Sequence, residues 1–134
     1  MEHKQPSNIT QDEKLFSLLS HILGIVFAIV FYFVMKDSKF VRFHALQAFW
    51  FQILELSTAF VLFLLIFFFT PLIDKTTGNP SCFIFFILMA IAIVVFGGLI
   101  YSVILGVSAF QGRLKEYPIV GRWAYDKVYK GLYF

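Results

Sequence analysis

The chain has 134 residues, of which 60% are hydrophobic and only 14% are charged, whereas soluble domains are about 45–50% apolar and about 25% charged. A chain this short cannot bury three long apolar blocks in a water-soluble core, so the composition predicts a membrane protein. The net charge of +3 is too scattered to favour nucleic acid as a partner, and the single cysteine, Cys82, excludes an internal disulfide and a cysteine-based metal cluster.

The first apolar block, residues 15–35, follows a polar segment that carries a helix start signal. Thr10 and Glu13 have the spacing of a capping box, in which each side chain bonds the backbone N–H of the other residue. We therefore expect a helix from about Gln11, whose capped extension leads into a first membrane span at residues 15–35. The block is too long for a signal-peptide core and lacks a small-residue cleavage site after it, which favours a retained span.

The second apolar block, residues 45–69, follows a short polar turn at residues 36–39. The first turns of its helix, up to His44, are amphipathic and are expected at the membrane interface. Thr70 and Pro71 begin a polar connection rich in turn-forming residues. The sequence therefore predicts that this second span ends near residue 69.

The third apolar block, residues 82–110, exceeds the ~20 residues that a span requires and stops at Gln111 and Gly112. The tail that follows carries too many charges for a fourth span. At residues 118–132 it has the pattern of an amphipathic helix lying in the interface. The apolar face of this helix comprises Val120, Ala124, Val128 and Leu132.

Together these elements predict an all-α integral membrane protein, with one membrane domain over residues 1–134 that contains three transmembrane helices and an interfacial C-terminal amphipathic helix. Eight of the 11 basic residues flank the same predicted side of the membrane. They are Lys36, Lys39, Arg42, Arg113, Lys115, Arg122, Lys127 and Lys130. By the positive-inside rule, we expect a multi-pass protein of the cell (plasma or inner) membrane, with its N-terminus outside and its C-terminus in the cytoplasm.

Glu55 is the only Asp, Glu, Lys or Arg inside the three apolar blocks. At 1.5 Å per residue, Glu55 and His21 lie at similar depths on their helices, so we predict a hydrogen-bonded pair. An ionisable group in a bilayer marks either an interhelical contact or a transport path. A structural pair that fixes helix register is the favoured interpretation, and a polar lining for a conduit is the alternative.

Small residues recur on one face of the third block, at Gly98, Ser102 and Gly106. In lipid, helices associate closely where small residues let their backbones approach. We therefore predict that this face makes the closest helix–helix contact.

Catalytic chemistry is not indicated by any motif in the chain. His44 lies three helical turns from Glu55, so these two residues do not form a metal site with His21, and no HExxH or CxxC pattern occurs. The serines have no candidate base at a plausible spacing. We predict no catalytic residue, no metal and no cofactor.

Three local patterns, in order along nearly the whole chain, resemble a known family. They are Thr10-x-x-Glu13 with Leu18-x-x-His21, the segment from Phe40 to Ala48, and Ala109-x-x-Gly112 followed by Tyr117-Pro118. The set is similar to small prokaryotic membrane proteins related to the Tic-twenty subunit of the chloroplast inner-envelope import translocon. This resemblance implies a helical membrane fold and, through the plastid relatives, a role related to protein translocation.

The most specific part of the resemblance contains Arg42, His44 and Gln47. Arg42 at the membrane surface suits a lipid phosphate or a neighbouring helix end. His44 and Gln47 suit backbone carbonyls left free where the first helix ends. A docking surface for a partner is the functional alternative for this motif.

The favoured function is a non-enzymatic subunit or scaffold of a membrane complex, with a protein partner or a second copy and the lipid bilayer around it. A small transporter or channel that uses Glu55 and His21 is the second hypothesis. The third is an immunity-type protective membrane protein.

Overall fold

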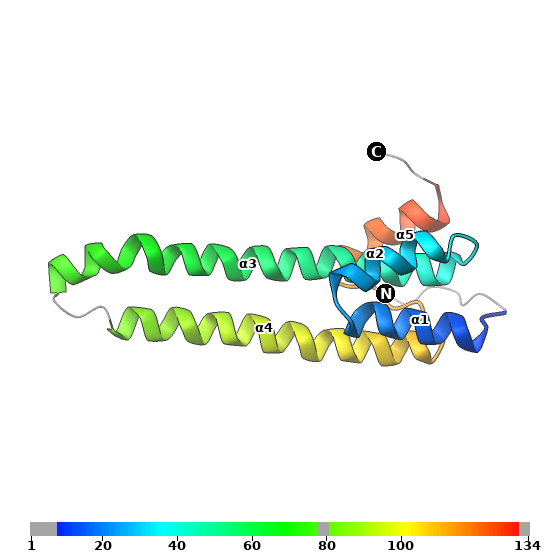
Figure 1. The fold of residues 1–134 in the computed structure, drawn as a ribbon, viewed down its shortest axis with the longest axis horizontal. Helices are drawn as coiled ribbons and strands as arrows, with labels where there is room; N and C mark the ends of the chain where they lie inside the picture. Colours follow the sequence, from blue (N-terminus) through cyan, green and yellow to red (C-terminus); the bar gives the residue numbers. More distant parts are fainter. Residues whose placement is uncertain (1–7, 78–80, 132–134) are drawn as a thin grey trace. The chain divides into compact units, whose positions relative to one another are not determined.

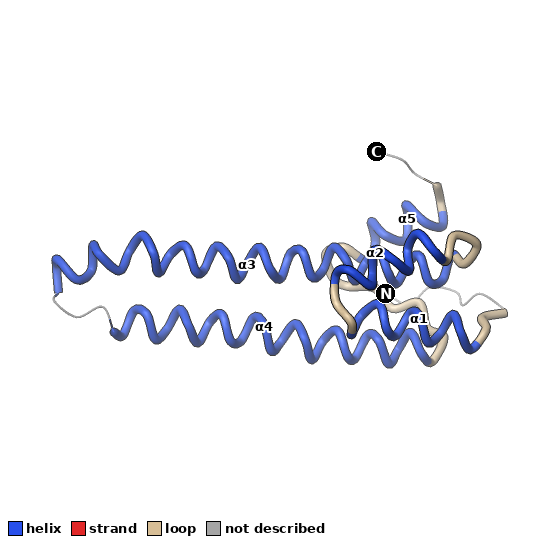
Figure 2. The backbone as a smooth tube through the Cα atoms, viewed as in Figure 1, coloured by secondary structure: helices blue, strands red, loops and turns tan. Residues whose placement is uncertain are grey.

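The computed structural model describes residues 8–77 and 81–131, which form five helices and, over those ranges, no strand (Figure 1). The helices are α1 (Gln11–Ile22), α2 (Ile25–Val34), α3 (Lys39–Thr77), α4 (Ser81–Phe110) and α5 (Gly121–Tyr129). Short loops connect most of them (Figure 2). At the start of α1 the predicted capping box is present, because Glu13 N–H donates to the Thr10 hydroxyl and Thr10 N–H donates to the Glu13 carboxylate.

Among the described residues, two helices are long and apolar enough to cross a membrane, over Lys39–Ile73 in α3 and Ser81–Phe110 in α4. The second and third predicted spans, residues 45–69 and 82–110, fall within them. These helices expose many large apolar side chains, including Phe67, Phe68 and Phe96. Such a surface suits lipid, since nothing in a bilayer core penalises exposed hydrocarbon.

The single helix predicted for the first span at residues 15–35 is not formed, because the helix breaks at Gly24, and this span is not confirmed. Gly24 has φ 91° and ψ −179°, a conformation that side chains with a Cβ rarely adopt. The break leaves α1 with 12 residues and α2 with 10, or about 18 Å and about 15 Å of helix. Neither helix can cross a hydrocarbon core of about 30 Å alone.

The predicted end of the second helix near residue 69 is also wrong, because α3 continues through Pro71 to Thr77. Proline removes one backbone donor from the helix. Ending the helix inside lipid would leave several backbone groups without partners, which costs more. The rest of the predicted polar connection, residues 78–80, lies outside the described residues.

The C-terminal helix is shorter than the predicted range of 118–132, and its apolar face covers protein. Ala124 and Val128 of α5 are buried in a cluster with Phe40, Phe43 and Leu114. Leu132, the last residue of the predicted apolar face, lies outside the described residues. Two residues of the predicted apolar face, Ala124 and Val128, are therefore confirmed as buried, and they pack against the start of α3 and the linker that precedes α5.

The chain divides into two compact units, and each is described by itself. Unit 1 contains the residues up to Ile53 and those from Ile100 onward, so it comprises α1, α2, the first part of α3, the end of α4, and α5. Unit 2, from Leu54 to Leu99, consists of the remaining α3 and α4 segments. Within unit 2 these segments run side by side (Figure 2), and the Phe69 and Phe83 rings lie 6.4 Å apart.

A buried polar core as candidate functional site

Unit 1 encloses a group of polar side chains that come from four different parts of the chain. His21 lies in the last turn of α1, His44 and Gln47 in the first turns of α3, Ser102 in α4, and Tyr117 in the linker before α5. All five are buried. We call these five residues the polar core.

Four members of the polar core form one continuous hydrogen-bonded chain. The Ser102 and Tyr117 hydroxyl oxygens are 3.0 Å apart, and the Tyr117 hydroxyl lies 3.3 Å from His21 Nδ1. On the other side of the ring, His21 Nε2 lies 3.2 Å from His44 Nδ1. Both ring nitrogens of His21 are therefore engaged inside unit 1.

Gln47, the fifth member, fixes the backbone of the linker. Its amide nitrogen donates to the Lys115 carbonyl at 2.9 Å, and its amide oxygen accepts from Tyr117 N–H at 3.3 Å. One side chain thus satisfies two linker backbone groups that no secondary structure would pair. This contact positions Tyr117 over the other members of the core.

The break between α1 and α2 frees backbone carbonyls, and Gln52 takes up one of them. Its amide nitrogen donates to the His21 carbonyl at 3.4 Å. We expected His44 and Gln47 to serve such carbonyls, but they bond the His21 ring and the linker instead. A residue of α3 therefore does bond a carbonyl at the end of α1, but that residue is Gln52 and not His44 or Gln47.

Close packing holds the core's elements together. A Cβ added at Gly106 would lie 2.9 Å from Leu18 Cδ1 and 3.4 Å from His21 Cβ, so this glycine lets α4 approach α1. The Phe51 ring stacks on the Tyr117 ring, with centroids 4.1 Å apart. Tyr117 is thus fixed through its ring as well as through its hydroxyl.

Burial determines the charge of the core. His21 belongs to α1, which lies outside both candidate spans, and desolvation lowers its pKa from 6.5 to about 3. The ring is therefore neutral at physiological pH, with one nitrogen protonated and the other accepting. A neutral imidazole between a hydroxyl and a second imidazole is a fully satisfied arrangement.

Arg42, the remaining residue of the predicted motif, lies outside the polar core. Its Nη2 donates to the Tyr32 hydroxyl at 3.1 Å, and its guanidinium carbon lies 4.8 Å from the centre of the Tyr32 ring. This contact joins α2 to the start of α3. The motif residues thus separate into one surface contact and two core residues.

Glu55 and Gly98 belong to unit 2, where a Cβ added at Gly98 would overlap the Glu55 carboxyl group. The predicted small-residue face is therefore divided, because Ser102 and Gly106 act in unit 1. The pairing of His21 with Glu55 stays a prediction.

The chemistry of this arrangement is that of a structural contact between elements of unit 1. Within residues 8–77 and 81–131, no group of three or more His, Cys, Asp or Glu side chains is placed to hold a metal ion. The polar core has hydroxyl and imidazole groups, which are buried and bond one another, except that His44 Nε2 has no hydrogen-bond partner among the described residues. What it supplies is a fixed connection between α1, α3, α4 and the linker.

Sequence reasoning missed two residues of this site. Tyr117 is singled out in the sequence only as part of the Tyr117-Pro118 pattern, and no sequence pattern assigns Gln52 a bond to the His21 carbonyl. The available signal for Tyr117 was its place directly after the helix stop at Gly112, where the chain must turn back over the bundle. Nothing local indicates that a residue 96 positions away from His21 becomes its partner.

Comparison with known proteins gives a family match over most of the chain. The model of the MamF/MmsF family, described as a magnetosome magnetite crystal formation protein family, matches residues 12–124. A UPF0132 membrane protein from Methanocaldococcus jannaschii is 43% identical over 37 residues, which cover 28% of this chain and 34% of that relative. The chain thus matches about a third of that relative's length. No solved structure matches.

These matches overturn the resemblance to the Tic-twenty family. The matched range of residues 12–124 includes most of the patterns on which that resemblance rested. Helix caps, a His-containing amphipathic helix start and a helix stop are features that many small helical membrane proteins need for physical reasons, so they do not discriminate between families. The role in protein translocation was implied only by that resemblance, so it is no longer supported.

Proposed function

Because this chain belongs to the MamF/MmsF family of magnetosome magnetite crystal formation proteins, we propose that it is a non-enzymatic scaffold of a membrane assembly. In this role it organises the membrane and its partners, and it does no chemistry itself. The partner is a protein of the same membrane or a second copy of the chain. The family description gives the setting, a membrane on which crystals form.

One observation carries this proposal: the hydrogen-bonded side chains of the polar core are buried in unit 1, while unit 2 exposes large apolar side chains. The hydrogen-bonded chain from Ser102 to His44 is buried. By contrast, Phe60, Phe63 and Phe67 expose 56–66% of their surface in unit 2. Exposed apolar area around a buried hydrogen-bonded core suits packing against lipid and neighbouring proteins better than turnover of a substrate.

The break at Gly24 changes the proposed orientation. With two spans instead of three, both ends of the chain lie on the same side of the membrane. Lys36, Lys39, Arg42 and the basic residues of the tail would lie on that side, and the positive-inside rule favours the cytoplasm for it. We therefore propose a cytoplasmic N-terminus, in place of the external one expected from three spans, and residence in the cell membrane or a compartment derived from it.

Cysteine labelling tests this orientation in a Cys82→Ser background. Probes at Asn8 and Lys39 should be protected from an impermeant reagent in intact cells, whereas a probe at Lys75 should react. A reactive probe at Asn8 with a protected one at Lys39 would restore the three-span topology.

The scaffold role is tested on the native membrane and in liposomes. After mild solubilisation, the chain should migrate in a stoichiometric assembly larger than a monomer, and the purified chain should carry no proton flux in liposomes. Proton flux that is lost in Glu55→Gln, with the fold intact, would replace the scaffold with the transporter hypothesis. Sensitivity of a deletion strain to a membrane-active peptide would favour the protective hypothesis instead.

A further inference from the structure

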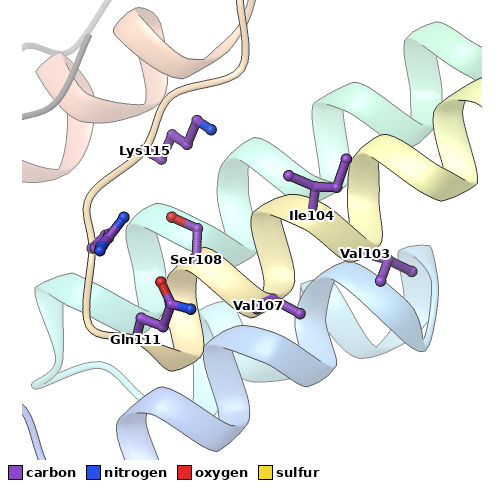
Figure 3. Close-up of a pocket in the computed structure, with 7 residues that line it drawn as sticks. Val103, Ile104, Val107, Ser108, Gln111 and Lys115 are labelled. Atoms are coloured by element: carbon purple, nitrogen blue, oxygen red, sulfur yellow. The ribbon is translucent and has the colours of Figure 1, made fainter.

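A groove of about 540 Å³ in unit 1 combines an apolar wall with a polar and basic end (Figure 3). Its volume falls within the range of about 300–1,000 Å³ typical of small-molecule sites. The lining residues are Val103, Ile104, Val107, Ser108, Gln111, Arg113 and Lys115. None of their side chains belongs to the polar core.

The apolar wall is part of a membrane span. Val103, Ile104 and Val107 are 40–49% exposed and lie one helical turn apart or adjacent on α4, within the candidate span Ser81–Phe110. Lipid acyl chains are therefore the natural neighbours of this wall. The wall leads directly to Ser108 and Gln111 at the end of the same helix (Figure 3).

The basic end is held in place by the backbone. Gly112, with φ 79°, ends α4, and Arg113 N–H donates to the Ser108 carbonyl at 3.1 Å. Further along, the Lys115 carbonyl accepts from Gln47. The two cations therefore sit on a segment whose backbone is bonded at both positions.

Burial alternates along this segment in a way that directs both cations outward. Leu114 is 1% exposed and packs in the core cluster, while Arg113 and Lys115 on either side of it are exposed. Residues two apart in extended chain share one side. The adjacent residue, Glu116, is half-buried, and its Cα and Cβ pack against Gly121.

We propose that this groove binds an anionic phospholipid, whose phosphate lies between Arg113 and Lys115 and whose first acyl carbons lie along Val103 and Val107. A guanidinium group presents paired N–H donors that match two phosphate oxygens, and a lysine adds a point charge. The Gln111 amide and the Ser108 hydroxyl supply further donors for a headgroup. The site requires only that α4 crosses the membrane, so it stands independently of the scaffold role.

Native mass spectrometry of the purified full chain tests the site. The chain is titrated with phosphatidylglycerol or phosphatidylcholine carrying the same acyl chains. The wild type should retain phosphatidylglycerol more strongly. The double variant Arg113→Gln/Lys115→Gln should lose about 25-fold of that preference, since each cation near an anionic lipid contributes about fivefold.

A matched control separates the site from general charge. Lys36 and Arg122 are exposed cations outside the groove, so Lys36→Gln/Arg122→Gln removes the same net charge and should keep the preference. Equal loss in both double variants, or no preference in the wild type, would overturn the proposal.

A second variant tests the apolar wall and the source of the phosphate. Val107→Trp fills the wall and should weaken phosphatidylglycerol binding, with the helical content unchanged by circular dichroism. If inorganic phosphate displaces the lipid while Val107→Trp binds as wild type does, the groove is a site for free phosphate and the lipid proposal is wrong.

Discussion

Replacing Tyr117 with Phe should destabilise unit 1 through one missing oxygen atom. The hydroxyl bridges Ser102 at 3.0 Å and His21 at 3.3 Å, and all three side chains are buried. Its removal leaves two buried polar groups without this partner. Each such group costs about 1–3 kcal/mol, so we expect a loss of about 2–6 kcal/mol in the free energy of unfolding.

The ring of residue 117 should stay where it is, because Phe keeps the stacked contact with Phe51. This makes Tyr117→Phe a test of hydrogen bonding and not of packing. The measurement is unfolding in mixed detergent micelles, followed by circular dichroism as the fraction of denaturing detergent rises. The matched control is Tyr101→Phe, because Tyr101 lies beside Tyr117 and is only partly buried, so it should change stability little.

A double-variant cycle assigns the loss of stability to the hydrogen bond between Ser102 and Tyr117. Ser102→Ala and Tyr117→Phe should be less costly together than the sum of the single changes, because both remove the same bond. Equal stability of Tyr117→Phe and the wild type would refute the argument that these hydrogen bonds hold the unit together. A loss in Tyr101→Phe of the same size would refute the assignment to the hydroxyl.

Three further predictions concern the backbone and pH. Gly24→Ala should cost about 1–2 kcal/mol in thermal stability, since a Cβ there meets no atom within 4 Å and only the φ of 91° is penalised; unchanged stability would contradict this. Gly121→Ala should cost about 1–3 kcal/mol, because its Cβ would lie 2.7 Å from Glu116 Cα, whereas Gly97→Ala, with no neighbour within 4 Å, should be neutral. Finally, because burial lowers the pKa of His21 from 6.5 to about 3, only the unfolded chain takes up this proton below about pH 6.5. Stability should be greatest above pH 6.5 and should fall as the pH drops towards 3, with a smaller slope in His21→Asn; a thermal midpoint independent of pH would contradict this.

Local patterns in the sequence predicted those parts of the fold that local chemistry decides. The capping box at Thr10 and Glu13 needs only four residues. The helix predicted at residues 82–110 matches α4 within one residue, because an uncharged apolar run between turn signals leaves few alternatives. The buried face of α5 follows from 3.6-residue periodicity.

The parts that were missed depend on competition between interactions far apart in sequence. A single glycine in an apolar run is tolerated in many membrane helices, so Gly24 alone does not predict that the helix ends there. Depth matching predicts that His21 pairs with Glu55, which stays a prediction, and helix length alone cannot rank several partners at comparable positions. The structure engages His21 with His44 and with Tyr117, and Tyr117 reaches it only because the linker folds back over the bundle.

The series of hydrogen bonds that runs from Ser102 through Tyr117 and His21 to His44 also has a direction. Each hydroxyl and each neutral imidazole in it donates one proton and accepts another, so its three contacts can all point towards His44 or all point towards Ser102. Whichever nitrogen carries the proton on His44 therefore fixes the tautomer of His21 and the rotation of both hydroxyl groups. The four side chains thus change together between two hydrogen-bonding states. The nitrogen chemical shifts of the two histidines report which state is present.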